Sequence, residues 1–267
     1  MSSAAYIQAA EELRENEGQW RAYESEGNCA ILAGPGSGKT KTITIKIARI
    51  LEEEIQRPQR LACITYSNEC VRELRGRLNA LGVDDRSRIL VSTIHSFALT
   101  EIVMPYAAMA GVAVPNPIAV AAPSKSEALF KQAYQTVKGV PPGKWYRMSL
   151  DRLRRTVLDK NSAEWKASSA QQTAIVEEYE RLLLDDGLID FDGLVLAGLQ
   201  VIERFEWVRK CLRSKFPVIV VDEYQDLGLP LHRMMCALML DAGVRIIAVG
   251  DPDQSIYGFT GAKPSLL

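Results

Sequence analysis

Short apolar runs rich in β-branched residues recur near both ends of the 267-residue chain. They read CAILA (29–33), RLACITY (60–66), RILVSTI (88–94), PVIVVDE (217–223) and RIIAVGD (245–251). Helical patterns separate them, and the one before the last run carries apolar residues at i, i+3, i+4 and i+7: Leu231, Met234, Met235 and Leu238. Fully apolar strands that alternate with helices predict an α/β fold, with a parallel sheet covered by helices on both faces.

The middle of the chain lacks a convincing strand pattern and instead carries helical patterns such as AQQTAIVEEYERLLLDDG. We therefore predict an α/β core made of two segments, 1–104 and 190–267, with a helical insertion at 105–189. Residues 125–166 of the insertion contain ten Lys or Arg and four Asp or Glu, so this part is locally basic.

The overall composition is that of an ordinary globular protein, with 47% hydrophobic residues, 24% charged residues and a net charge of −1. It gives no global reason to expect a polyanionic partner, although a local basic groove is compatible with it. The five scattered cysteines lack CxxC spacing, which favours reduced, buried thiols over a metal site or disulfides. No secretory signal is visible, and prolines interrupt the uncharged run 102–123. We expect a cytoplasmic protein without a membrane partner.

The glycine-rich stretch AGPGSGKT follows the first apolar run and precedes a helical pattern. It fits the phosphate-binding pattern G-x-x-x-x-G-K-[ST] in the required strand-to-helix context. Glycines let several backbone N–H groups turn toward phosphate oxygens, and the helix N-terminus adds its dipole. The lysine reaches the β and γ phosphates, and the threonine hydroxyl ligates Mg²⁺. The predicted site for a nucleotide with Mg²⁺ consists of Ala33, Gly34, Pro35, Gly36, Ser37, Gly38, Lys39 and Thr40.

Two acids end the fourth apolar run, whose strand would lie beside the phosphate loop. Asp222 can hold Mg²⁺ through water, and Glu223 can orient and deprotonate the attacking water. An acid pair after a strand would by itself also suit a helix N-cap, but the phosphate loop favours catalysis. Lys39 and Glu223 are therefore the first two predicted catalytic residues.

A third polar cluster, GDPDQSIYGFTGA (250–262), follows the last apolar run. Gln254 would lie at the tip of a neighbouring parallel strand and face the γ-phosphate. Its amide can hydrogen-bond the phosphate or the attacking water, and these partners change when the phosphate leaves. We therefore predict that Gln254 is a catalytic residue and a sensor that links hydrolysis to movement.

The order of these motifs resembles the N-terminal half of the UvrD/Rep/PcrA group of superfamily 1 DNA helicases. AGPGSGKT looks like their motif I, ITYSNECVRELRGRL (64–78) like motif Ia, VSTIHSFAL (91–99) like motif Ib, VVDEYQD (220–226) like motif II and GDPDQSIYGFTGA like motif III. LIDFDGLVLAGL (188–199) is similar to the segment that returns from the inserted subdomain to the core. The resemblance implies a RecA-like, ATP-binding core of a helicase that moves along single-stranded DNA in the 3′→5′ direction.

The resemblance also implies residue roles that the patterns alone do not give. Gln19 sits where the family has its adenine-reading glutamine, which favours ATP, and Lys41 stands where an arginine often packs over the adenine. Single-stranded DNA would contact Tyr66, Ser67, Asn68, Thr93, His95, Ser96, Tyr257 and Phe259. Hydroxyl and amide groups suit phosphates, and aromatic rings stack on bases. A packing role remains an alternative for His95, and a core role for the last two aromatics.

The insertion itself lacks recognisable family motifs. Its basic character and interleaved aromatic residues could assist the DNA-facing surface. Alternatively, it is a solvated basic helix face with Trp145 and Trp165 as core anchors.

The sequence departs from the family at Lys41 and at Thr260, where the family usually has arginine. The family's second core domain would begin just after Ala262, so we expect that domain as a partner, with the chain alone binding ATP but hydrolysing it poorly. The departures leave open a nucleotide-gated DNA- or protein-binding module without motor activity. A small-molecule kinase or synthetase is the third possibility, and the sequence suggests no acceptor pocket for it.

Overall fold

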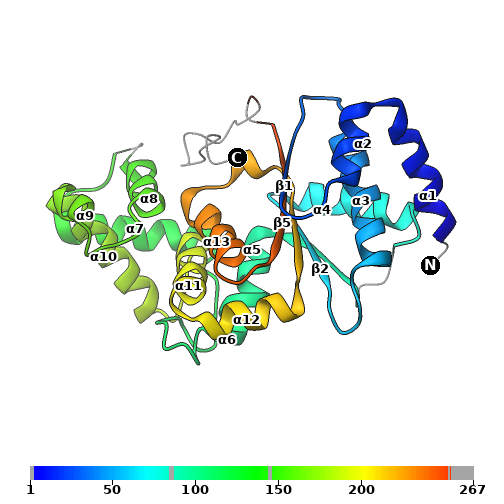
Figure 1. The fold of residues 1–267 in the computed structure, drawn as a ribbon. Coiled ribbons are helices and arrows are strands. Elements are labelled where there is room, and N and C mark those ends of the chain that lie inside the picture. Colours follow the sequence, from blue (N-terminus) through cyan, green and yellow to red (C-terminus); the bar gives the residue numbers. More distant parts are fainter. Residues whose placement is uncertain (1–2, 84–86, 144–145, 252, 254–267) are drawn as a thin grey trace.

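The computed structural model describes residues 3–83, 87–143, 146–251 and 253. Its centre is a five-stranded, all-parallel sheet with the strand order β1-β5-β4-β2-β3 (Figure 1). The strands are β1 (Cys29–Leu32), β2 (Leu61–Thr65), β3 (Ile89–Thr93), β4 (Val218–Val221) and β5 (Arg245–Gly250). All five predicted strands are confirmed, each within two residues of its expected bounds. The α/β class is confirmed with them.

Alternate residues of the central strands point to opposite faces of the sheet, and each face carries its own hydrophobic cluster. On β4, Val218 and Val220 pack toward one cluster and Ile219 and Val221 toward the other. Because both faces are buried, the strands need apolar residues at every position, as the sequence patterns indicated.

The first face is covered by α1 (Ser3–Glu11), α3 (Lys39–Glu53) and α4 (Asn68–Ala80). The short η1 (Glu12–Glu15) and α2 (Glu17–Glu24) pack beside α3. Consequently the two helices that begin near the glycine-rich loop, α2 and α3, are in direct contact.

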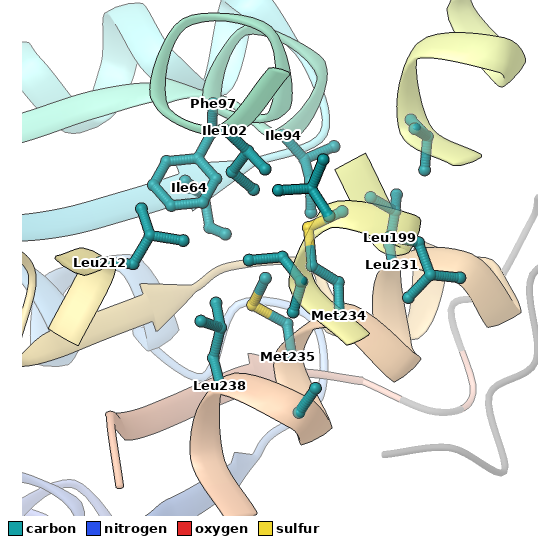
Figure 2. Packing of buried hydrophobic residues seen from close by; sticks show 14 of the residues in the cluster. Ile64, Ile94, Phe97, Ile102, Leu199, Leu212, Leu231, Met234, Met235 and Leu238 are labelled. Atoms are coloured by element: carbon teal, nitrogen blue, oxygen red, sulfur yellow. The ribbon is translucent and has the colours of Figure 1, made fainter. Parts of the chain in front are cut away.

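The second face is covered by helices from distant parts of the chain. They are α5 (Ile94–Phe97), η2 (Ala98–Val103), α6 (Met104–Tyr106), α11 (Phe191–Arg204), α12 (Glu206–Lys215) and α13 (Leu229–Leu240). Figure 2 shows Met234 and Met235 of α13 packed among Ile64, Phe97 and Leu199. The four apolar α13 positions expected from the sequence are all buried. The sequence patterns did not predict α12 or η2. Because η2 is π-helical, its apolar residues do not follow the 3.6-residue period of an α-helix.

The middle of the chain forms α7 (Pro123–Lys138), α8 (Tyr146–Thr156), α9 (Ala163–Ala167) and α10 (Ala170–Asp185). These helices pack around a third hydrophobic cluster and lie away from the sheet, opposite α1–α3 (Figure 1). Trp165 is buried in that cluster, so it is a core anchor rather than an exposed ring. Trp145 lies outside the described residues. The boundaries 105–189 of the insertion stay a prediction.

The cysteines are all free, but the expectation that they are buried is wrong for four of them. Cys63 is buried in β2, whereas Cys211 is exposed and the other three are half-buried. Cys211 lies in α12, which the sequence did not predict. Within the described part of the chain, no helix is both long and apolar enough to cross a membrane.

Candidate functional site

The carboxyl ends of the parallel strands bring three polar segments to one edge of the sheet. The glycine-rich loop follows β1, Asp222 and Glu223 follow β4, and Asp251 follows β5. Because β5 lies between β1 and β4, Asp251 is between the loop and the acid pair. Crevices outside the carboxyl ends of strands are where open α/β sheets bind ligands.

The glycine-rich loop turns into α3 through two left-handed residues, Gly36 at φ 69° and Gly38 at φ 84°. Glycine adopts such angles without strain. In this structure the Lys39 ammonium donates to the Ala33 carbonyl at 2.7 Å and the Gly34 carbonyl at 3.3 Å. It also lies 3.9 Å from Asp251 Oδ2. The loop therefore holds its own cation at the place where a phosphate would bind.

Gln19 of α2 reaches the same loop, as expected from its role in the resembling family. Its Nε2 donates to the Ser37 carbonyl at 2.7 Å, and Asn16 caps α2 by accepting from the Gln19 amide at 3.1 Å. A Cβ atom on Gly38 would lie only 2.6 Å from Gln19 Nε2, so the end of the Gln19 side chain would have to move if another residue replaced this glycine. Lys41, by contrast, forms an ion pair with Glu12 at 2.7 Å.

A fully buried lysine joins α2 to α3. The Lys46 ammonium donates to the carbonyls of Ala22, Tyr23 and Ser25 at 2.9, 3.0 and 2.5 Å. These are carbonyls at the C-terminal end of α2, where a positive charge is favoured. Burial lowers the pKa of Lys46 to about 8. The helix that carries Gln19 is thus held to the helix that begins with Lys39.

The acid pair after β4 has an unusual environment. Burial, and next the charge of Glu223, raise the pKa of Asp222 to about 6, while Lys39 acts in the opposite direction. Glu223 has φ 55°, the one left-handed non-glycine residue in the described chain. Such a backbone costs about 1–3 kcal/mol and is commonest at functional sites.

Gln225, a residue to which the sequence assigned no role, connects the acid pair to β5. Its Nε2 donates to Glu223 Oε2 at 2.6 Å, and its Oε1 accepts from the Asp251 amide at 3.0 Å. The side chain is almost fully buried. A buried amide that uses both ends in this way fixes the position of the Glu223 carboxylate. In the sequence, Gln225 is only a glutamine between a tyrosine and an aspartate, and this signal is too weak to identify a role.

Three aromatic rings line up beyond the next strand ends. The Tyr66 and His95 rings meet edge to face at 6.3 Å, and the His95 and Phe191 rings at 5.6 Å. Phe191 is 53% exposed. Tyr66, His95, Arg155 and Asp192 help to line a small cavity of about 80 Å³. We call Tyr66, His95 and Phe191 the aromatic row.

The sequence named two members of the aromatic row but missed Phe191, which begins α11. The signal available was a phenylalanine next to aspartates, an unusual neighbourhood for a core residue. Burial lowers the pKa of His95, while Asp192 opposes this shift. His95 is therefore neutral near pH 7.

The hydroxyl and amide groups expected at the DNA surface lie beside this row. Ser67 caps α4 by accepting from Cys70 N at 3.1 Å, and Thr93 caps α5 by accepting from Ser96 N at 3.2 Å. Asn68 and Ser96 are exposed. The caps explain these residue types by local structure, so their DNA contacts stay a prediction.

Two further expectations concern the segment after β5 and the basic residues of the insertion. Gln254, Tyr257 and Phe259 lie outside the described residues, as does Thr260. The basic excess of the insertion is largely engaged in ion pairs, for example Arg147 with Glu127 at 3.2 Å. A cavity of about 630 Å³ lies between the insertion and α11, away from the glycine-rich loop.

Together, the parallel sheet, the glycine-rich loop after β1 and the acid pair after β4 define a P-loop nucleotide-binding core of the RecA-like type. The chain belongs to the UvrD/REP helicase family, whose N-terminal domain matches residues 15–267. Within the proteins of that family, the chain corresponds to the ATP-binding region of the helicase.

Two relatives illustrate the similarity. The ATP-dependent DNA helicase Rep of Escherichia coli strain K12 is 31% identical over 274 residues, which cover 96% of this chain and 38% of Rep. The ATP-dependent DNA helicase PcrA of Staphylococcus aureus strain Mu50 is 29% identical over 245 residues, which cover 89% of this chain and 33% of PcrA. The chain thus spans well under half the length of these relatives.

The raised pKa of Asp222 has a measurable consequence for stability. Between about pH 4 and pH 6 the folded protein keeps a proton that the unfolded chain releases, so stability falls as the pH rises through this window. The deficit then persists above pH 6. Without divalent cations, Asp222→Asn should raise the free energy of unfolding by about 1–3 kcal/mol at pH 8, and by less at pH 4.

Urea denaturation in EDTA at both pH values measures this effect. Asp185→Asn, at an exposed ion pair of α10, is the control and should change stability by less than about 0.5 kcal/mol. An equal gain from Asp222→Asn at both pH values would contradict the assignment.

Proposed function

We propose that the chain is the ATP-binding half of an ATP-dependent helicase that translocates on single-stranded DNA, with 3′→5′ polarity. One observation carries the proposal. Lys39, Asp222 and Glu223 converge at a single edge of the sheet, and the aromatic row follows the neighbouring strand ends. The proposed nucleotide site and the proposed base-stacking surface would therefore lie at neighbouring strand ends of one sheet.

ATP binding replaces contacts that the loop makes with itself. Lys39 leaves the Ala33 carbonyl for the β and γ phosphates, and the loop amides together with the α3 N-terminus receive the remaining phosphate charge. Gln19, already at the loop, offers its amide to the adenine edge. Both contacts lie on helices that Lys46 holds together.

The donor set at the acid pair fits Mg²⁺. Asp222 is a buried carboxylate beside a second acid, and its pKa is raised first by burial and next by the charge of Glu223. A divalent cation would favour the charged form of this carboxylate. Thr40 and Asp222 would hold the ion, and oxygen donors of this kind are those that Mg²⁺ prefers. When bound, Mg²⁺ neutralises charge on the phosphates.

Glu223 is the proposed general base. Gln225 donates to one of its oxygens, which leaves the carboxylate oriented and still able to accept a proton from water. The same Gln225 accepts from Asp251, the first residue after β5. Gln254 follows three residues later and remains the predicted sensor of the γ-phosphate.

The alternative is a nucleotide-gated module that grips DNA or a protein without moving along it. Lys41 favours it to some degree, because it pairs with Glu12 instead of lying free for the adenine. A motor and a module differ in how strongly single-stranded DNA stimulates ATP hydrolysis.

Lys39→Ala removes the charge that faces the phosphates. Such charge-assisted contacts contribute about 1.5–3 kcal/mol, so affinity for a fluorescent ATP analogue should fall roughly 10- to 100-fold. Lys210→Ala, at an exposed pair on α12, is the matched control and should bind normally. Unchanged titration by the Lys39 variant would remove the phosphate-site assignment.

Gln225→Met keeps the buried volume but loses both hydrogen bonds. In the full-length protein, kcat for ATP hydrolysis should fall roughly 10- to 100-fold, because a base misplaced by about 1 Å is far less effective. The nucleotide Kd should stay within about twofold. Gln200→Met makes the same change on the exposed face of α11 and should leave kcat unaltered. A parallel loss of affinity and kcat would indicate a general structural role instead.

The ATPase comparison tests the function itself. Single-stranded DNA should strongly stimulate steady-state phosphate release by the full-length protein, and Glu223→Gln should abolish that release. The 267-residue chain alone should bind ATP with near-background hydrolysis, because an arginine supplied by a second domain is worth about 10³–10⁵ in related phosphoryl transfer. Weak stimulation of the full-length protein would favour the nucleotide-gated module. DNA-stimulated turnover by the chain alone would show that it completes its own site.

A further inference from the structure

The last turn of α8, in the insertion, holds the first turn of α11, in the core, through two arginine–aspartate pairs. Arg154 forms a bidentate pair with Asp190, at 2.7 Å from Oδ2 and 3.0 Å from Oδ1. Arg155 donates to Asp192 Oδ1 at 2.9 Å. The residue between the two aspartates is Phe191, the exposed end of the aromatic row. We call these two pairs the arginine clamp.

The buried half of the clamp is fully satisfied. Arg154 and Asp190 are both buried, and the carboxylate also accepts from Tyr179 Oη at 3.0 Å and from the Gly193 amide at 2.8 Å. Each Asp190 oxygen therefore has two donors. This geometry lowers the pKa of Asp190 although burial acts in the opposite direction, so the pair stays charged at neutral pH.

The sequence around α11 is shaped to admit the clamp. A Cβ atom at Gly193 would lie 2.9 Å from Asp190 Oδ1 and 3.6 Å from Arg154 Nη2. Glycine at this position lets the carboxylate cap the helix and receive the guanidinium at once. The start of α11, and with it the backbone of Phe191, is thereby fixed relative to α8.

The partly exposed half of the clamp lies at the aromatic row itself. Arg155 and Asp192 line the same small cavity as Tyr66 and His95. Phe191 contacts His95 edge to face, so a shift of α11 would move one ring of the row against the other two. An exposed aromatic residue at the beginning of a helix is held in one orientation by contacts of this kind.

We infer that Arg155 and Asp192 are positioning residues for single-stranded DNA binding: their ion pair ties the helical insertion to Phe191 and keeps the aromatic row aligned. The inference rests on the proposed function and adds to it a role for the insertion. The insertion then contributes to DNA binding through the Arg155–Asp192 contact with the core, and its basic surface is not required. Arg154 and Asp190 anchor the same turn but are buried, so their replacement would also leave a buried charge without its partner.

Arg155 could instead contact a DNA phosphate directly, and the two possibilities give opposite results for its partner. If the pair positions Phe191, Arg155→Ala and Asp192→Ala should each weaken binding of a labelled oligo-dT about 5- to 50-fold, since one base–aromatic contact is misplaced. If Arg155 binds a phosphate, Asp192→Ala should leave affinity equal or higher, because it frees the guanidinium and removes a negative charge.

The slope of log K against log salt provides a second readout. A positioning role leaves the slope unchanged in both variants, whereas loss of a direct phosphate contact reduces it by about one. The double variant Arg155→Asp with Asp192→Arg should restore much of the affinity for oligo-dT, because the ion pair forms again with its two charges exchanged. Arg152→Ala, which removes an exposed charge from the same helix, is the control.

Fluorescence anisotropy on the full-length protein, with ATP-analogue affinity measured in parallel, decides between the outcomes. Weakened DNA binding by both single variants, with normal nucleotide binding and unchanged slopes, supports the inference. Normal DNA binding by Asp192→Ala, or a reduced slope for Arg155→Ala alone, overturns it while leaving the proposed function intact. Failure of the unmodified protein to bind oligo-dT would overturn the proposed function, and the inference with it.

Discussion

The position of β5 between β1 and β4 is the constraint on which the rest of the site depends. Parallel pairing brings Leu32 opposite Gly250 and Val221 opposite Ala248, so β1 and β5 end together and β4 ends two residues before them, at the same edge of the sheet. Both faces of the sheet are covered by apolar clusters, which leaves the strand ends as the place where polar groups can emerge. The phosphate loop, the acid pair and the segment after β5 must therefore meet.

At that edge a chain of contacts runs from Lys39 to Glu223. Lys39 binds loop carbonyls and approaches Asp251, Asp251 donates to Gln225, and Gln225 donates to Glu223. The network links the phosphate-binding lysine to the proposed base through the residue that begins the third motif. Any ligand that withdraws Lys39 alters the surroundings of Asp251, two hydrogen bonds away from Glu223.

The sequence was sufficient for the parts that depend on local pattern. Fully apolar strands, the glycine-rich loop and the acids after β4 are each readable over a few residues, and the structure has them as expected. Parts that depend on tertiary neighbours were not readable. Gln225 gains its role only because β4 and β5 are adjacent. Phe191 gains its role from the contact of its ring with His95, a residue almost a hundred positions earlier.

The insertion shows the same limit in its charges. Its basic excess suggested an exposed surface for a polyanion, but arginine side chains such as Arg147 and Arg154 are directed at acids on neighbouring helices. A count of charged residues does not show which way their guanidinium groups point. The aromatic residues have the same limit, because Trp165 is buried in the core of the insertion rather than exposed to a partner. The motifs that resemble a helicase identified the family because they report chemistry at strand ends, where local sequence and tertiary position coincide.

The buried Lys46 has a consequence for the way affinity is distributed over a ligand. By tying the end of α2 to α3, it keeps Gln19 and the phosphate loop at a constant separation. In the proposed function, a nucleotide anchored at the loop by its phosphates would present its base to Gln19 at a high effective concentration, and the second contact would cost little additional ordering. The two contacts would then act as a chelate, in which each strengthens the other.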